Sequence, residues 1–235
     1  MSARFGIYWT PPLGSALWNL ASALLGRDAA TGLDLPRPEL TGIDPARLAE
    51  LTGQPGFYGL HATLKPPFRL KPGAEPDDLL RALAELCLSL TPFDLPALEV
   101  TVLDGFLALR PSSPSPELEA LAKACVCDLD RFRAEPEPRE LAKRQAHGLS
   151  PAQEEMLKAW GYPYVLDEYR FHVSLTGRVG NLAEREKLQL ALDDYLRGAL
   201  ADFQVNEVCL FEQAGPNVPF RLTRRFALGP SLAGL

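Results

Sequence analysis

Residues 59–65 are Gly59-Leu60-His61-Ala62-Thr63-Leu64-Lys65, and residues 170–176 are Arg170-Phe171-His172-Val173-Ser174-Leu175-Thr176; both contain the form His-x-(Thr/Ser)-Leu. Two of the chain's 3 histidines lie in these matched surroundings. Side chains alternate between the two faces of a β-strand. Each stretch therefore predicts a strand with an apolar face toward a core and a polar face that carries an imidazole and a hydroxyl.

Strict alternation gives each polar face a definite set of residues. The first face holds His61, Thr63 and Lys65, and the second holds Arg170, His172, Ser174 and Thr176. If the fold turns these faces toward each other, they form a symmetric pocket with two imidazoles and two hydroxyls. Such a pocket suits a phosphate group and the proton transfers of its chemistry.

The segments that follow the two motifs repeat each other. The first motif is followed by a predicted helix at 77–90 and by strands at 93–103 and 106–110, joined at the turn Asp104-Gly105. The second motif is followed by a predicted helix at 182–200 and by strands at 203–211 and 220–228. This order predicts a duplicated β-α-β-β unit and an α+β fold with two similar lobes.

The rest of the chain surrounds this duplicated unit. We expect one bilobal domain over residues 1–235, with a helical segment at about 117–160 that connects or covers the lobes. Before the first motif, the pattern predicts a strand at 4–9, a helix at 14–25 capped by Ser15 and a loop at 27–42. A helix at 44–51 capped by Asp44 and a turn at 54–56 follow. The pair Pro66-Pro67 is expected to end the first motif strand.

Composition narrows the class of protein. The net charge of -6 and the pI near 5.2 argue against a broad nucleic-acid-binding surface. We expect no leader peptide and no membrane span, hence a cytoplasmic protein without membrane contact, and a monomer. The cysteines lack zinc spacing and are expected to be reduced residues of the core or helices: Cys87, Cys125, Cys127 and Cys209.

Several polar residues have more than one interpretation. Lys65 and Arg170 are either edge charges or phosphate contacts, and we predict them as substrate-binding residues. A metal site made of His61, His172 and a carboxylate is a further interpretation, but neither motif has an acidic residue at the spacing of a metal ligand. We therefore predict no metal and no cofactor. The plainer interpretations are a helix cap for His147, solvated charges for Arg69 and Arg178, and pocket lining or simple packing for Tyr8, Tyr58, Tyr164 and Tyr169.

The pair His61-Ala62-Thr63-Leu64 and His172-Val173-Ser174-Leu175 resembles the motifs of the 2H phosphoesterase superfamily. That superfamily includes RNA 2′,3′-cyclic phosphodiesterases, once called 2′-5′ RNA ligases (LigT-like proteins). Residues 58–68 and 161–172, together with the opening 8–32, look like a bacterial branch of unknown function (DUF1045-like) that is described as phosphonate metabolism protein. The resemblance covers nearly the whole chain.

The resemblance implies a bilobal LigT-like fold, in which two pseudo-symmetric lobes of antiparallel sheet and helices surround a central cleft. It also implies metal-independent acid–base chemistry on a phosphodiester. By motif position, His61 and His172 would be the general acid and base, in an order left open, while Thr63 and Ser174 would hold phosphate oxygens. Members of the branch suggest a sugar cyclic phosphate or a related phosphonate intermediate as substrate.

The sequence therefore predicts a phosphoric diester hydrolase that acts on a small cyclic phosphate. One alternative keeps the chemistry and changes the substrate to RNA ends, which the acidic pI disfavours. Another is a non-catalytic module that binds a nucleotide or a phosphorylated metabolite.

Overall fold

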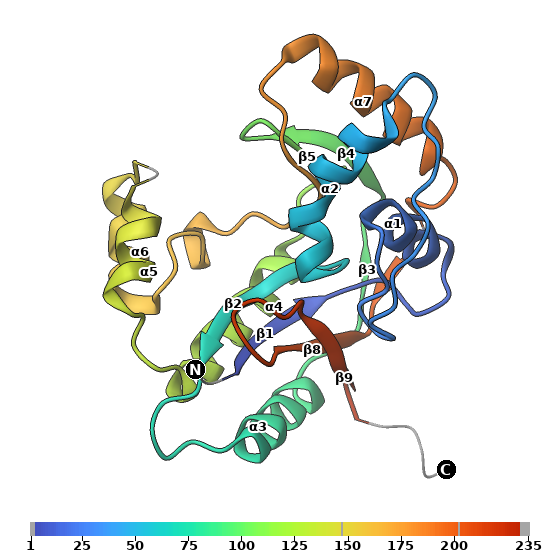
Figure 1. Cartoon of the computed structure of the whole chain (residues 1–235). Coiled ribbons are helices and arrows are strands. Elements are labelled where there is room, and N and C mark those ends of the chain that lie inside the picture. The colour runs from blue at the N-terminus through green and yellow to red at the C-terminus, as the bar shows by residue number, and fades with distance from the viewer. Residues whose placement is uncertain (1–2, 147, 202, 231–235) are drawn as a thin grey trace.

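A seven-stranded antiparallel sheet dominates the computed structural model, which describes residues 3–146, 148–201 and 203–230 (Figure 1). The strand order is β4-β5-β6-β2-β1-β8-β9, and β3 and β7 form a separate antiparallel ribbon. The strands are β1 Arg4–Trp9, β2 Ala62–Arg69, β3 Phe93–Leu95, β4 Leu98–Leu103, β5 Phe106–Pro111, β6 Val173–Arg178, β7 Phe203–Val205, β8 Glu207–Gln213 and β9 Arg221–Ala227. The predicted α+β class with antiparallel pairing is confirmed.

Seven α-helices and two 3₁₀ turns fall within the described ranges. They are α1 Ala16–Leu25, α2 Pro45–Tyr58, α3 Pro76–Leu88, α4 Pro116–Leu129, η1 Asp130–Phe132, α5 Pro138–Gln145, α6 Pro151–Trp160, η2 Leu166–Glu168 and α7 Leu182–Tyr195. The predicted caps are confirmed, because the side chains of Ser15 and Asp44 accept hydrogen bonds from backbone N–H groups of the first turn. None of these helices has the length and apolarity needed to cross a membrane.

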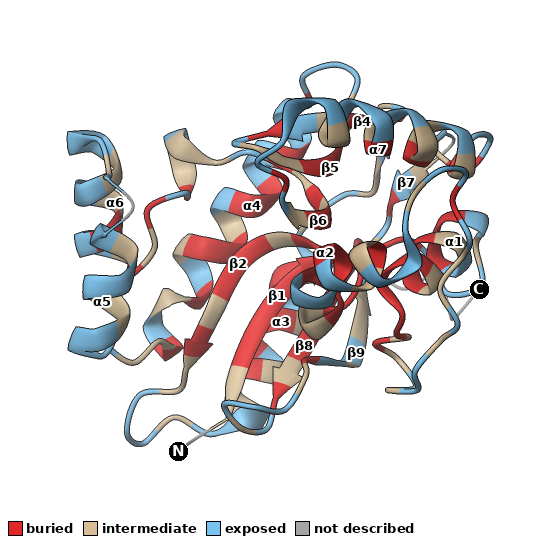
Figure 2. Ribbon diagram, turned by 45° about the horizontal axis from the view of Figure 1, so that its top comes forward, coloured by how far each residue is buried: buried red, intermediate tan, exposed pale blue. Residues whose placement is uncertain are grey.

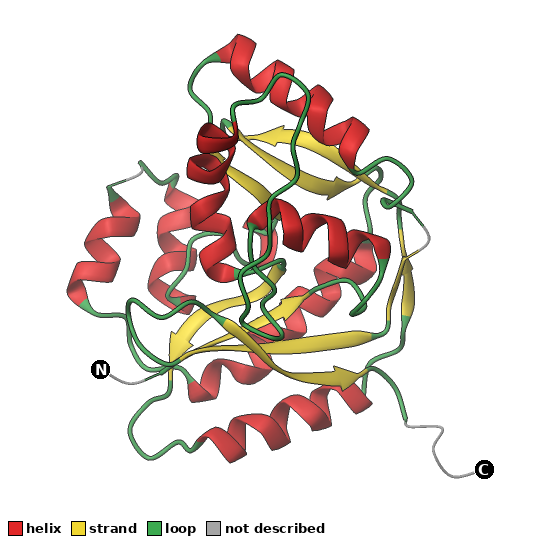
Figure 3. Ribbon diagram, turned by 45° about the vertical axis from the view of Figure 1, so that its right-hand side comes forward, coloured by secondary structure: helices red, strands yellow, loops and turns green. Residues whose placement is uncertain are grey.

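The sheet has two parts, each built around one histidine motif (Figure 3). We call them the β2 lobe (β2, β1, β8, β9 and α3) and the β6 lobe (β6, β5, β4 and α7). Figure 1 shows α7 over β4 and β5, and α3 on the side of β8 and β9. Each lobe thus takes its motif strand and helix from one half of the sequence and its hairpin from the other half. The predicted repeat is present, but a lobe is not one half of the sequence.

Two predicted strands are each broken into two pieces. The predicted strand 93–103 consists of β3 and β4, and the predicted strand 203–211 consists of β7 and β8. In both copies the first piece joins the β3–β7 ribbon and the second piece joins the main sheet. Pro96 lies at the first break, where it cannot donate to a strand ladder. The continuous strands predicted at these places are wrong because the chain changes partner as it crosses between lobes.

Prolines account for two further corrections. The turn predicted at 54–56 is wrong, because α2 continues through Pro55 to Tyr58. Burial of Leu48, Leu51 and Pro55 on the side of α2 that meets β6 offsets the missing helical hydrogen bond. The predicted end of the motif strand at residues 66–67 is also wrong. The pairing of β2 with β6 lies near the start of β2, so two prolines further along need no donor on that side.

The core lies between the sheet and its helices, and Figure 2 shows β1, β2 and β8 as largely buried strands at its centre. The hairpin predicted at Asp104-Gly105 is confirmed, with positive φ angles of 46° and 87° that suit its tight turn. Three cysteine thiols are buried, Cys127 is partly exposed, and all four are free, as predicted. The predicted helix cap at His147 lies outside the described residues.

Candidate active site

The two histidine motifs meet where β2 pairs with β6. Ala62 is the partner of Val173 in this antiparallel pair, and both side chains are completely buried. Residues on either side of a paired position in an antiparallel pair also lie across from each other. His61 therefore lies across from Ser174, and Thr63 lies across from His172, on the face opposite the buried pair. The structure brings the four predicted catalytic residues together.

Both imidazoles are held by the same hydrogen bond. Nδ1 of His61 lies 2.8 Å from the carbonyl oxygen of Gly59, and Nδ1 of His172 lies 2.7 Å from the carbonyl oxygen of Arg170. A carbonyl only accepts, so Nδ1 carries the hydrogen in both rings and Nε2 is the nitrogen left for chemistry. Gly59 has a φ of 82°, and an added Cβ would lie 2.5 Å from Cβ of Ala29, so glycine is required at the turn that orients His61.

His61 lies in an aromatic pocket. Its ring stacks on Tyr8 with centroids 4.0 Å apart and an interplanar angle of 30°, and Tyr58 is stacked at 6.0 Å. Burial lowers the pKa of His61 to about 4; the hydrogen bond to Gly59 opposes this shift and the nearby charge of His172 adds to it. The His61 imidazole is therefore neutral at pH 7, with a lone pair on Nε2.

His172 lies in a more polar setting. Its ring is tilted by 59° against Phe106 at 5.7 Å. Burial lowers the pKa of His172, the carbonyl of Arg170 opposes this shift, and the Arg110 guanidinium adds to it. The nearby Asp104 carboxylate raises the same pKa, whereas the charge of Arg170 lowers it. Opposing charges thus surround this imidazole, unlike that of His61.

Lys65 does not share the face of His61, and this prediction is wrong. Tyr8 pairs with Thr63 but Ile7 pairs with Lys65, so β2 has an extra residue at this point, a β-bulge that breaks the alternation. The Lys65 side chain is 2% exposed, and its ammonium group lies 3.0 Å from Oδ1 of Asp130 and 3.0 Å from the carbonyl of Val126. Lys65 ties η1 and α4 to the sheet and is not available to a phosphate in the histidine site.

The strand of the second motif is also irregular. The register of β6 against β5 shifts between Ala108 and Phe106, and Thr176 is buried rather than on the polar face. Its hydroxyl accepts a hydrogen bond from the N–H of Leu107 at 3.0 Å and donates one to the carbonyl of Gly177 at 2.8 Å. The fourth residue after each histidine therefore turns into the core in both copies. Arg170 remains exposed beside His172.

Arg110 is a candidate functional residue that sequence analysis did not identify. The pairs Ala108–Ser174 and Leu109–Val173 place it across from His172. Its buried Nε has no hydrogen-bond partner among the described residues. An unpaired donor beside a candidate catalytic histidine suits a phosphate oxygen. The sequence holds no local signal for it, because it reaches His172 only through the pairing of strands distant in sequence.

Arg69, predicted to be solvated, is instead paired. Its guanidinium lies 3.2 Å from a carboxylate oxygen of Glu137 and 2.8 Å from one of Glu140. These ion pairs fix the start of α5 against β2. Among the described residues, no group of three or more acidic, histidine or cysteine side chains is placed to hold a metal ion.

A family model described as "Protein of unknown function (DUF1045)" matches residues 63–221, about two thirds of the chain. The chain belongs to this family. The match confirms the resemblance to the bacterial branch of unknown function that the sequence motifs indicated.

Two curated relatives are named ribose 1,5-bisphosphate phosphokinase PhnN. The one from Janthinobacterium sp. (strain Marseille) is 38% identical over 173 residues, which are 74% of this chain and 38% of that protein. The one from Laribacter hongkongensis (strain HLHK9) is 33% identical over 228 residues, which are 94% of this chain and 51% of that protein. The chain therefore spans about half, or less, of the length of these relatives.

Solved structures with a related arrangement include E. coli LigT in its apo form, with a TM-score of 0.44 and 14% identity over 97% of this chain and 98% of that chain. A protein described as a phosphoesterase has a TM-score of 0.42 and 13% identity over 98% of this chain and 100% of that chain. These similarities do not show which reaction, if any, this chain catalyses.

Proposed function

We propose that the chain hydrolyses a cyclic phosphodiester, without a metal ion, by using its two histidines as base and acid. The observation that carries the proposal is the pairing of Ala62 with Val173, which sets two imidazoles and two hydroxyls on one face of the sheet. A phosphorus atom bound between them has a proton acceptor, a proton donor and hydroxyl donors within one site.

His61 is the general base of this mechanism. Its pKa of about 4 keeps it neutral, and its Nε2 takes the proton of a water molecule as the water oxygen forms its bond to phosphorus. His172 is the general acid. Burial lowers its pKa in the free protein, but Asp104 opposes this shift and the negative charge of a bound phosphate raises the pKa, so that Nε2–H can give its proton to the oxygen that leaves phosphorus.

The remaining polar groups stabilise the charge that develops on the phosphate. Thr63 and Ser174 donate hydroxyl hydrogens to its non-bridging oxygens, and Arg110 supplies the cation that was predicted at Lys65. Arg170, exposed beside His172, contributes a second cation to the same oxygens. These fixed donors face the site before the substrate arrives, which is the arrangement that lowers a reaction barrier most.

The substrate is a ribose cyclic phosphate in this proposal, and the reaction belongs to phosphonate metabolism, as the resemblance implies. The support is the name of the two longer relatives, which specifies ribose 1,5-bisphosphate as the compound that they phosphorylate. Hydrolysis of ribose 1,2-cyclic phosphate 5-phosphate with release of the 2-oxygen would form ribose 1,5-bisphosphate. The reaction proposed here would therefore supply the compound named for those relatives.

Phosphorus NMR tests the proposal directly. The protein is incubated in EDTA with ribose 1,2-cyclic phosphate 5-phosphate, 2′,3′-cyclic nucleotides and a short RNA with a cyclic end. We expect ring opening of the ribose compound, and a loss of about 100- to 10,000-fold in kcat for His61→Gln and for His172→Gln. The matched control is Lys65→Met, which removes a cation of the same motif that faces away from the site.

Other outcomes distinguish the alternatives. Wild-type turnover in both histidine variants would show that the mechanism is wrong. Hydrolysis confined to the RNA would identify RNA end processing, and tight binding of these compounds without turnover would identify a non-catalytic binding module.

A further inference from the structure

A second group of polar side chains lies beside His61 and has no role in the mechanism above. It begins at Tyr8, whose ring lies under the His61 imidazole. The phenol extends back along β1 over Gly6, where an added Cβ would lie 2.6 Å from the hydroxyl oxygen. The lack of a side chain at Gly6 therefore allows Tyr8 to lie along the strand, with its hydroxyl toward Arg4.

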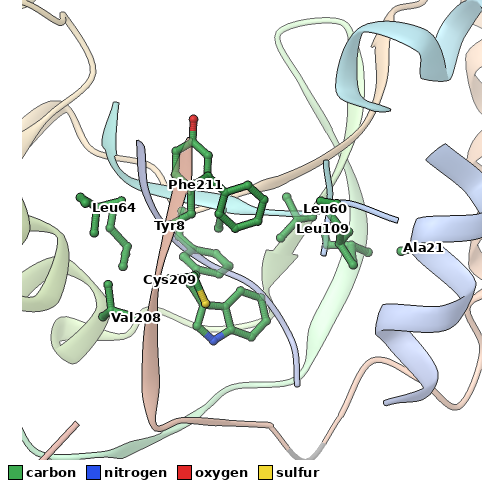
Figure 4. Close-up of a cluster of buried hydrophobic side chains, with 14 of the residues drawn as sticks. Tyr8, Ala21, Leu60, Leu64, Leu109, Val208, Cys209 and Phe211 are labelled. Atoms are coloured by element: carbon green, nitrogen blue, oxygen red, sulfur yellow. The ribbon is translucent and has the colours of Figure 1, made fainter. Parts of the chain in front are cut away.

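The hydroxyl of Tyr8 is buried and lacks a hydrogen-bond partner in the described part of the chain. The residue is 0% exposed, and no described residue forms a hydrogen bond with its oxygen. Figure 4 shows this oxygen at the tip of the ring, pointing away from the apolar side chains of the cluster. Buried hydroxyls are almost always hydrogen-bonded, so this one points to a partner from outside the chain.

Arg4 is the first cation of this group, and its charge acts on the Tyr8 hydroxyl. Its guanidinium lies over the ring of Phe220 at 5.4 Å, and Phe220 is stacked on Tyr58 at 5.0 Å and lies 6.3 Å from Tyr8. Its Nε donates to Oε1 of Gln213 at 2.7 Å, which fixes the guanidinium plane and leaves the terminal nitrogens for another acceptor.

Arg144 of α5 is the second cation. It lies over the ring of Tyr162 at 5.1 Å, and the charge of Arg4 is close enough to act on it. Burial lowers the pKa of Arg144, the nearby Glu140 carboxylate opposes this shift, and the charge of Arg4 adds to it. Glu140, one turn earlier on the helix, is bound to Arg69 at 2.8 Å.

Arg4 thus lies near a buried hydroxyl, and its charge and that of Arg144 are close enough to interact. Among the described residues neither Arg4 nor Arg144 forms an ion pair with a carboxylate. Like charges brought together in a partly buried place are unfavourable unless an anion joins them. A phosphate monoester fits this combination, because it accepts from two guanidinium groups and from a phenol.

We propose that Arg4, Arg144 and Tyr8 bind a second phosphate of the substrate, a terminal monoester, while the cyclic phosphate lies between the two histidines. The proposal rests on the proposed function and narrows it to cyclic phosphodiesters that carry another phosphate. The rings of Tyr58 and Phe220, stacked between His61 and Arg4, form the surface on which the sugar lies. In ribose 1,2-cyclic phosphate 5-phosphate, the second phosphate is the one at carbon 5.

A pair of substrates that differ only in this phosphate tests the proposal. We compare kcat/KM for ribose 1,2-cyclic phosphate with and without the 5-phosphate, in Arg4→Gln, Arg144→Gln and the control Arg139→Gln. Arg139 is an exposed residue of the same helix as Arg144. We expect Arg4→Gln and Arg144→Gln to reduce kcat/KM about 10- to 100-fold more for the 5-phosphorylated compound, and Arg139→Gln to affect both equally. Equal losses for the two compounds in Arg4→Gln and Arg144→Gln would overturn the second phosphate site and leave the proposed function intact.

Binding of ribose 5-phosphate gives an answer even if neither compound is hydrolysed. Calorimetry is expected to show binding that Arg144→Gln weakens about tenfold or more and that Arg139→Gln does not change. Tyr8→Phe should also weaken binding without loss of folding stability, since its hydroxyl has no partner in the described chain. Equal affinity in the wild type, Arg144→Gln and Tyr8→Phe would overturn the site, whereas absence of turnover alone would overturn only the proposed function.

Discussion

The two histidine motifs have the same backbone arrangement but different surroundings. In each motif the imidazole Nδ1 donates to the carbonyl two residues earlier, at 2.8 Å for His61 and 2.7 Å for His172. The four residues after each histidine also show the same order of burial, with the hydroxyl residue partly exposed between buried neighbours. The duplication therefore extends to the irregularity that follows each hydroxyl.

The surroundings give the two imidazoles different properties. His61 stacks on Tyr8 and is held neutral by burial, whereas His172 lies among the charges of Arg110, Asp104 and Arg170. Burial lowers the pKa of both imidazoles, and His172 has a carboxylate nearby that opposes this shift, as the proposed general acid requires. Similar motifs thus do not imply equal roles.

The largest expected effect on stability concerns the fourth residue after each histidine, which is buried in both copies. Asp130→Asn would leave the ammonium of Lys65 buried beside a neutral amide, and we expect the free energy of unfolding to fall by about 3 to 5 kcal/mol. Lys65→Met removes that charge, and Asp130 keeps Arg133 at 2.7 Å, so its cost should be about 1 to 2 kcal/mol. Urea denaturation at pH 7 measures both.

Thr176→Val is the matching change in the second motif. It leaves the N–H of Leu107 without its acceptor and should lower the free energy of unfolding by about 1 to 3 kcal/mol.

The comparison of Lys65→Met with Asp130→Asn has an outcome that would contradict the structural role given to Lys65. If Lys65→Met lowered the free energy of unfolding more than Asp130→Asn, the ammonium would contribute more than its ion pair explains, and that role would be wrong.

Much of this arrangement could be predicted from the sequence because it is local. The two motifs, the cap at Ser15 and the turn at Asp104-Gly105 are set by residues near one another in the chain. The orientation of Lys65 could not be predicted, because it depends on a bulge of β2 against β1. A one-residue change of register reverses the faces of every residue beyond it, and periodicity within a single strand does not show it.

The cation of the site illustrates the same limit. Sequence proximity to His61 pointed to Lys65, but the pairing of β5 with β6 sets Arg110 across from His172. Likewise, the assignment of each hairpin to the lobe of the other half follows from strand order, which only long-range packing decides. Local patterns identified the candidate reacting groups, and pairings between distant strands determine which groups surround them.

Arg110→Gln tests which of the two cations acts in the site. If Arg110 holds a non-bridging oxygen beside His172, its loss should reduce kcat/KM for the cyclic substrate about 10- to 100-fold. Lys65→Met, which removes an equal charge that faces α4, should retain most of the activity of the wild type once its folding has been verified by circular dichroism. Equal kcat/KM in the two variants would show that Arg110 does not contribute to the reaction.

The smallest expected effect is a shift in pH dependence, and it tests the asymmetry of the two imidazoles. The pH profile of kcat/KM reports the free enzyme, so its acidic limb should follow His61 near pH 4 and its alkaline limb should follow His172, below the ordinary histidine value of 6.5. Asp104→Asn removes the carboxylate that raises the pKa of His172, and asparagine tolerates the positive φ of 46° at this turn. We expect the alkaline limb to move to lower pH and the acidic limb to stay in place.

Asp94→Asn, at an exposed position of β3, is the charge-matched control and should move neither limb. Movement of the acidic limb in Asp104→Asn would reverse the assignment of base and acid, because the group that responds to Asp104 would then be the one that must lose its proton before reaction. If instead neither limb moved, Asp104 would have no influence on the reacting groups. The difference between the two motifs would then have to arise from the stacking of Tyr8 on His61 alone, and Tyr8→Leu would be the variant that raises the acidic limb.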